Sequence, residues 1–131
     1  MAFTRFIPAS DDNALDALPR VDIAYAYAGC DGTAVQAFAA AGARGIVSAG
    51  FAPGGTSPNE TAALKDAAAR GVIVVQSTRA GSGRVFRGTK HRENGFLVAD
   101  NLNPQKARIL LALALTRTSD PDAIAGMFAR Y

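Results

Sequence analysis

Short apolar runs alternate with helical patterns from residue 21 onward, and this alternation constrains the fold more than any other feature. The runs are rich in β-branched residues and cover Val21–Tyr27, Gly45–Ala49, Val72–Val75 and Phe96–Ala99. Val72–Val75 is apolar at every position, which is typical of a parallel strand buried on both faces. Strands that alternate closely with helices form right-handed βαβ units. We therefore predict an α/β fold, a small open three-layer sandwich of about four parallel strands with helices on both faces.

Capping signals predict where the helices begin. Thr33–Gln36 and Ser57–Glu60 each have the pattern of a capping box, and the two helices would end at Gly42 and at Arg70-Gly71. The first of these helices should bury an apolar face formed by Val35, Phe38 and Ala39.

A long helix is predicted from Pro104, because Asn103 before it can serve as an N-cap. Its buried face would be formed by Ala107, Leu110, Leu111 and Ala114. Asp120-Pro121 should cap a last helix that buries Ile124, Met127, Phe128 and Tyr131. Residues 79–94, rich in glycine and positive charge, predict a long loop.

The domain organisation is simple at this length. We predict a polar lead-in or interdomain linker at residues 1–20 and one α/β domain at 21–131. Residues 1–20 lack the apolar core of a signal peptide, so no export signal is expected. The protein would be cytoplasmic as encoded, or periplasmic if a parent protein is secreted. The net charge of +3 does not require a nucleic-acid or membrane partner, and the single Cys30 cannot form an internal disulfide.

Ligands of parallel sheets gather at the carboxyl ends of the strands, which are rich here in glycine and small polar residues. Gly54–Ser57 would present free N–H groups at a helix N-terminus, a suitable site for an anion or a carboxylate. Alternatively, Ser57 only caps its own helix. A positive cluster in the following loop is either solvated or contacts an anionic group; its members are Arg79, Arg84, Arg87, Lys90 and Arg92.

Several common active-site motifs are excluded. Gly83–Lys90 resembles a phosphate-binding loop, but its threonine and lysine are in the wrong order. The only histidine is His91, and no G-x-S-x-G segment occurs, so a serine–histidine triad is not supported. One cysteine and one histidine do not form a zinc site. We predict no metal and no cofactor.

The segment Asn101–Leu111, Asn-Leu-Asn-Pro-Gln-Lys-Ala-Arg-Ile-Leu-Leu, closely resembles the last long helix of the bacterial L-asparaginases. The similarity extends over about Leu18 to Tyr131, in the same order, through Pro19–Gly32, Gly45–Gly50 and Gly71–Arg79. These amidohydrolases convert L-asparagine and water to L-aspartate and ammonia. The resemblance implies their Rossmann-like C-terminal domain.

The resemblance also implies what is missing. The family's larger N-terminal domain carries a nucleophilic threonine in a T-G-G-T-I segment, a second threonine in a T-D-T segment and a lysine base, and none of these occurs here. The chain should therefore be inactive alone. Its implied roles are oligomerisation and supply of one wall of a neighbouring subunit's active site. The implied partners are an N-terminal asparaginase domain or another copy (a dimer or tetramer) and a small amino-acid substrate, with no nucleic acid and no membrane.

The family's accessory residues align with this chain imperfectly. An asparagine after the second strand falls on Gly55, and a glutamate before the fourth strand falls on Gly88. Substitutes would come from an accessory substrate-binding set of Gly54, Gly55, Thr56, Ser57, Asn59 and Glu93. The choice between asparagine and glutamine stays open.

Two functions of other classes are alternatives to the asparaginase role. One is a stand-alone α/β module that binds a small carboxylate or amide ligand on the glycine-rich edge of the sheet. The other, a flavodoxin-like signalling domain, is disfavoured because Asp31 is the lone acidic candidate at that edge.

Overall fold

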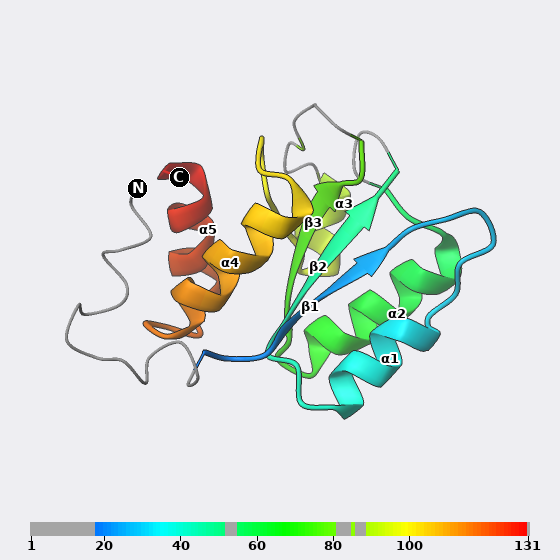
Figure 1. The fold of residues 1–131 in the computed structure, drawn as a ribbon, viewed down its shortest axis with the longest axis horizontal. Helices are drawn as coiled ribbons and strands as arrows, with labels where there is room; N and C mark the ends of the chain where they lie inside the picture. The colour runs from blue at the N-terminus through cyan, green and yellow to red at the C-terminus, as the bar shows by residue number, and fades with distance from the viewer. Residues whose placement is uncertain (1–17, 52–54, 81–84, 86–88, 131) are drawn as a thin grey trace.

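The structure is a computed structural model of the chain, and it describes residues 18–51, 55–80, 85 and 89–130, with the backbone alone at 89 and 90. Within these residues, four parallel strands form one sheet in the order β1-β2-β3-β4 (Figure 1). The strands are β1 Val21–Tyr25, β2 Gly45–Gly50, β3 Ile73–Thr78 and β4 Leu97–Val98. The predicted parallel α/β fold is confirmed.

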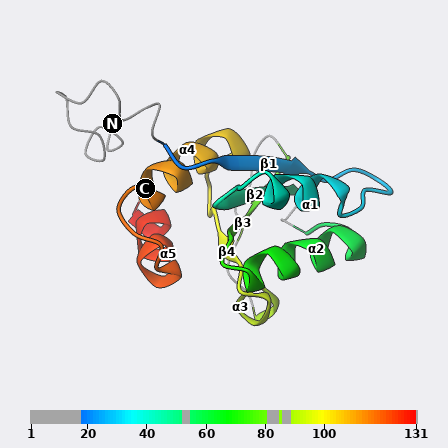
Figure 2. The same cartoon turned by 90° about the horizontal axis from the view of Figure 1, so that it is seen from below.

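Helices cover both faces of this sheet, which confirms the three-layer arrangement. They are α1 Thr33–Ala40, α2 Pro58–Ala69, α3 Thr89–Asn94, α4 Pro104–Leu115 and α5 Pro121–Arg130. Figures 1 and 2 show α1 and α2 side by side on one face, and α4 on the other with α5 beside it.

Each central strand contributes alternate side chains to two cores. Ile46 and Val74 face α1 and α2, whereas Val47 and Val75 face α4 and α5. All four are fully buried, as expected for a parallel sheet covered on both faces. On the α4 side, the predicted face of the long helix is confirmed, because its members are all buried: Ala107, Leu110, Leu111 and Ala114.

The helix starts follow the predicted caps in three of four cases. At α5, Asp120 Oδ1 accepts the Asp122 N–H at 3.2 Å. Ser57 Oγ accepts a hydrogen bond from the Glu60 N–H at 3.2 Å, and Asn103 Oδ1 accepts one from the Lys106 N–H at 2.8 Å. The capping box at Thr33 is wrong. Helix α1 begins at Thr33 itself, with Gly32 as the N-cap and no side-chain cap bond. The carboxylate of Asp31, two residues before Thr33, accepts the Thr33 N–H at 3.0 Å, so Asp31 and not Thr33 supplies the local side-chain hydrogen bond.

The loop predicted for residues 79–94 is wrong at its end, where α3 spans Thr89–Asn94. Helical periodicity gave no signal because this six-residue helix has no apolar face. Gly95, at a φ of 77°, ends the helix, and the Phe96 N–H donates to the His91 carbonyl at 2.7 Å.

The last helix also differs in part from its prediction. Ile124 and Phe128 are buried in the core, as expected, but Met127 is only partly buried against it. Tyr131 lies outside the described residues.

Helix α1 also buries less of its predicted face than expected. Only Val35 of that face is buried, while Phe38 packs partly buried against the core. None of the helices described is long and apolar enough to cross a membrane.

Candidate functional site

The carboxyl edge of the sheet is where the chain places its polar loops, because all the strands run in the same direction. The turn after β1 and the loop after β2 are joined there by hydrogen bonds. The Cys30 thiol donates to Ser57 Oγ at 3.3 Å and lies 3.8 Å from Thr56 Oγ1. Ser57 Oγ in turn donates to the Cys30 carbonyl at 2.7 Å. Ser57 therefore links the turn after β1 to the loop after β2 by hydrogen bonds, and it also caps α2.

Replacing Ser57 should test this double role. We expect Ser57→Ala to lower the free energy of unfolding by about 1–2 kcal/mol, since it removes the cap of α2 and its bond to the Cys30 carbonyl. The measurement is urea denaturation followed by circular dichroism. Ser119→Ala, at an exposed position between α4 and α5, is the control and should change stability by less than about 0.5 kcal/mol. Equal effects of the two substitutions would contradict this role.

Phe51 and Gly55, on either side of the loop after β2, are hydrogen-bonded to each other, and Phe51 contacts Arg79, the residue that follows β3. The Phe51 N–H donates to the Gly55 carbonyl at 2.6 Å, and the Gly55 N–H donates back at 3.0 Å. The Arg79 guanidinium lies 4.8 Å from the centre of the Phe51 ring, in a cation–π contact. Arg79 is exposed, so it presents a positive charge at the edge of the sheet.

The structure brings together most of the described members of the predicted accessory set. Thr56 and Ser57 are half-buried and Gly55 and Asn59 exposed, all at the N-terminal end of α2. Glu93 is exposed on α3, and the residue that ends α3, Gly95, packs near Ala68 at the opposite end of α2. Glu93 is therefore not placed with the others. Gly54 lies outside the described residues, as do Gly88, Arg84, Arg87 and the side chain of Lys90.

Hydroxyl groups near this edge serve structural hydrogen bonds. Ser48 Oγ accepts from the Gln76 amide at 3.3 Å, and Ser77 Oγ donates to the Leu102 carbonyl at 3.0 Å. Thr78 Oγ1 accepts the Ala80 N–H at 3.1 Å. None of these three contacts joins a hydroxyl to a general base, which a nucleophilic hydroxyl needs. Among the described residues, no group of three or more histidine, cysteine or acidic side chains could hold a metal ion.

Asp31 has a perturbed pKa at the start of α1. Hydrogen bonds from the Thr33 backbone N–H and side chain hold the pKa of this exposed carboxyl below its ordinary value. Because the folded pKa is the lower one, the stabilisation is present above the ordinary aspartate pKa and is lost as pH falls through the lowered value.

We expect the Thr33 amide proton to report this titration in NMR spectra recorded at decreasing pH. Its chemical shift should change with a midpoint below the ordinary aspartate value, and the change should vanish in Asp31→Asn. A midpoint at or above the ordinary value would refute the hydrogen bond as the cause.

Glu60 has a role that the sequence did not indicate. The capping-box pattern predicts only a helix start at this position, but Glu60 is 2% exposed. Its spacing from Leu64 and Ala67 could have shown this, because the three lie at i, i+4 and i+7 on the buried face of α2. Glu60 Oε1 is buried with no hydrogen-bond partner among the described residues.

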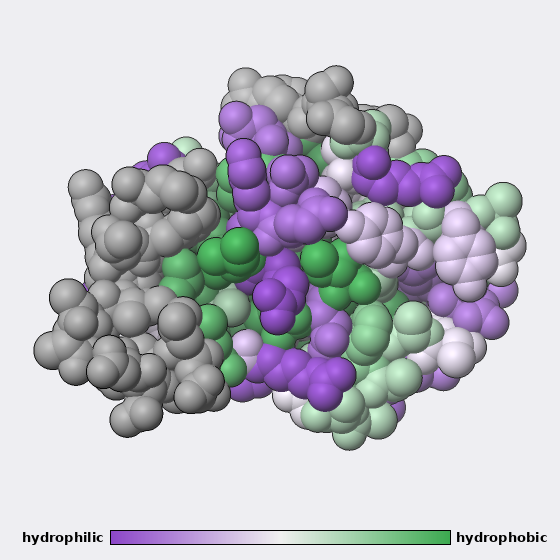
Figure 3. All heavy atoms as spheres, in the orientation of Figure 1, coloured by the Kyte–Doolittle hydropathy of each residue, from purple (hydrophilic) through white to green (hydrophobic). Residues whose placement is uncertain are grey.

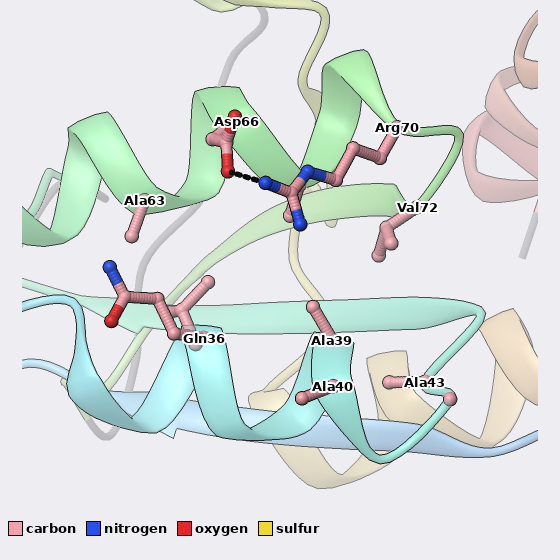
Figure 4. Close-up of a pocket in the computed structure, with 11 residues that line it drawn as sticks. Gln36, Ala39, Ala40, Ala43, Ala63, Asp66, Arg70 and Val72 are labelled. Atoms are coloured by element: carbon pink, nitrogen blue, oxygen red, sulfur yellow. Dashed lines mark ion pairs between the residues drawn. The ribbon is translucent and has the colours of Figure 1, made fainter.

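Hollows open on the side of the sheet covered by α1 and α2. One, of about 410 Å³, lies between the two helices and is lined mainly by small residues (Figure 4). Asp66 and Arg70, the charged members of its lining, are exposed and paired with each other at 3.1 Å. This groove therefore offers no unpaired charge among its described residues. Another hollow, of about 250 Å³, contains Glu60 and lies at the carboxyl end of β1.

The fold and its polar edge define an open α/β domain of the kind that places ligands at the carboxyl ends of its strands. Residues 20–128 match the glutaminase/asparaginase C-terminal domain, and the chain belongs to this family. The resemblance drawn from the sequence is confirmed.

Characterised relatives carry the same region within longer chains. The chain is 44% identical over 117 residues to L-asparaginase 2 of Bacillus subtilis, covering 89% of this chain and 31% of that one. It is 40% identical over 123 residues to L-asparaginase 2 of Escherichia coli, covering 92% and 35%. It is 39% identical over 124 residues to a glutaminase-asparaginase of Pseudomonas fluorescens, covering 92% and 34%. The chain thus spans about a third of the length of these relatives.

A solved structure agrees with the fold. The crystal structure of a probable cytoplasmic L-asparaginase from Campylobacter jejuni superposes with a TM-score of 0.84 at 42% identity. The match covers 89% of this chain and 39% of that chain.

Proposed function

We propose that this chain acts as the C-terminal domain of an L-asparaginase-type amidohydrolase, which converts L-asparagine and water to L-aspartate and ammonia. Its role would be to support oligomerisation and to form one wall of a neighbouring subunit's active site. The observation that carries the proposal is the family match over residues 20–128, within relatives about three times as long. In support, hydroxyls near the carboxyl edge are committed to structural hydrogen bonds rather than to a base.

The proposed partner is an N-terminal asparaginase domain or another copy of this chain, and the face formed by β1 and α4 is suited to a protein contact. Tyr25 and Ile109 are 47% and 45% exposed there. They lie close to each other, because Gln105, one turn before Ile109 on α4, donates to the Tyr25 hydroxyl at 2.9 Å. Figure 3 shows hydrophobic groups interleaved with polar ones on this face. We expect dimers or larger species in light scattering, and a stable monomer would count against this role.

The chain alone should release no ammonia from asparagine above a heat-treated control. The positive test replaces the matching region of L-asparaginase 2 from Bacillus subtilis with this chain, and the chimera should hydrolyse asparagine. Failure of a folded chimera, or turnover by the isolated chain, would overturn the proposal.

Gly55 offers a sharper test within that chimera. A Cβ added at Gly55 meets nothing within 4 Å among the described residues, so a side chain fits there. Because the family's asparagine falls on this position, Gly55→Asn should raise kcat/KM about tenfold or more by adding a polar group at the proposed wall. Ser119→Asn, at a remote exposed position, should leave it unchanged. An unchanged rate in Gly55→Asn would argue against this edge as part of the site.

A second candidate is a stand-alone module for a small carboxylate, favoured by the exposed Arg79 held over Phe51. Thermal shift of the isolated chain with aspartate, asparagine and glutamine separates the two functions. Only a self-sufficient binder should show a higher melting temperature with these ligands.

A further inference from the structure

The cavity at the carboxyl end of β1 is built from three parts of the chain. Its walls come from β1, from the turn and helix α1 that follow it, and from the first turn of α2. Its volume is about 250 Å³, which is below the size of pockets that hold drug-sized ligands. The cavity can therefore take only a small molecule.

The deepest polar group in this lining is the carboxyl of Glu60. The side chain is 2% exposed, and Oε1 has no hydrogen-bond partner among the described residues. Burying an acceptor without a hydrogen-bond partner costs free energy. A donor to this oxygen would stabilise it, and the described residues do not supply one.

Three donors of neighbouring residues are committed to other groups. The Cys30 thiol donates to Ser57 Oγ, and Ser57 Oγ donates to the Cys30 carbonyl. The Thr33 N–H is taken by Asp31. A hydrogen for Glu60 Oε1 would therefore come from outside this set.

The charges of the cavity favour a cation. Among the residues that the structure describes, its lining includes two acidic side chains, Asp31 and Glu60, and no lysine, arginine or histidine. Asp31 is exposed and its lowered pKa keeps it ionised at neutral pH, so the mouth of the cavity is negative. The ammonium group of an amine carries positive charge and several N–H donors, which match both needs.

The rest of the lining suits the carbon chain of such a ligand. Tyr27 is a large exposed aromatic residue of this lining, and aromatic faces attract cations as well as alkyl groups. Ala37 adds a small side chain from α1, which leaves the space open.

We propose that this cavity binds a small primary amine, with its ammonium group hydrogen-bonded to Glu60 and its carbon chain beside Tyr27 and Ala37. The site is formed entirely by this chain, and the inference does not rest on the proposed asparaginase role. It assigns a function to a buried carboxylate that the role as a helix cap leaves unexplained.

The test is a titration of the full chain with n-propylammonium chloride at neutral pH, followed by ¹H–¹⁵N NMR and matched for ionic strength with NaCl. We expect saturable shifts of the Asp31, Thr33 and Glu60 amides. 1-Propanol has the same number of heavy atoms but no charge, and it should bind at least about tenfold more weakly. Absence of saturable shifts at these amides, or equal binding of the alcohol, would overturn the proposal.

Variants identify the residues responsible. Glu60→Gln keeps the shape of the side chain but removes its charge, and should weaken amine binding about tenfold or more. Glu93→Gln removes an exposed glutamate on α3 and should leave binding unchanged. If Glu60→Gln binds as tightly as the parent chain, the inference is wrong.

Ala37→Leu provides an independent check should Glu60→Gln fail to fold. Ala37 is an exposed residue of α1, where leucine is a good helix former, and the larger side chain would fill the cavity. Binding should be lost in this variant while the remainder of the NMR spectrum is retained. Undiminished binding would contradict the proposed location.

Discussion

Leu110→Ala should lower the free energy of unfolding by about 2–5 kcal/mol, a large part of the stability of a domain this size. Leu110 is fully buried on α4, in the core that also contains Val47 and Val75 of the sheet. Removing its isobutyl group leaves a cavity that the rigid sheet cannot fill.

The neighbouring residue supplies the control. Ile109 is 45% exposed on the same helix, so Ile109→Ala loses much less buried apolar area and should cost below about 1 kcal/mol. Both variants are measured by urea denaturation at one fixed protein concentration, because association would add to apparent stability. Similar losses for the two substitutions would mean that α4 does not pack as described.

Gly32→Ala is the second substitution expected to have a large effect, although it adds only a methyl group. A Cβ at Gly32 would lie 2.6 Å from the Cβ of Ala63, which is fixed to the backbone of α2 and cannot rotate away. The backbone of Gly32 is not in the left-handed region, since its φ is −82°. The cost therefore comes from the close approach of α1 to α2, and we expect a loss of about 1–3 kcal/mol.

A paired substitution tests this cause. Gly126→Ala adds a methyl group within α5, where no atom of the described residues lies within 4 Å, and should instead stabilise by about 0.5–1 kcal/mol. Ala63→Gly in the Gly32→Ala background removes the clashing atom and should recover part of the loss, as a double-mutant cycle would show. Independent, additive effects at the two positions would contradict the contact.

Local sequence signals were sufficient for most of the fold. Asn103 and Pro104 define the start of α4, because a side-chain cap and a proline at the first helical position act locally, whatever the surrounding fold. Ser57 and the proline after it do the same for α2. The failures at α1 and α3 have different causes. Asp31 competes with Thr33 for the same short-range capping role, and α3 is too short and polar for periodicity to detect.

The candidate site was predictable only in part. The sequence indicated the carboxyl edge and the segment from Gly55 to Asn59, because strand direction alone brings these residues there. It did not indicate the cavity around Glu60, which depends on how three separate segments pack. Nor could it place Glu93, since that depends on the position of α3 beside the far end of α2.

The order of the strands in space repeats their order in the chain, so each strand can add to its predecessor as synthesis on the ribosome proceeds. The layer formed by α1 and α2 can be completed while α4 is still within the exit tunnel. The opposite side of the sheet, which includes Val47 and Val75, would then stay uncovered until α4 and α5 emerge. A nascent chain that stalls before α4 should consequently be a preferred client of chaperones.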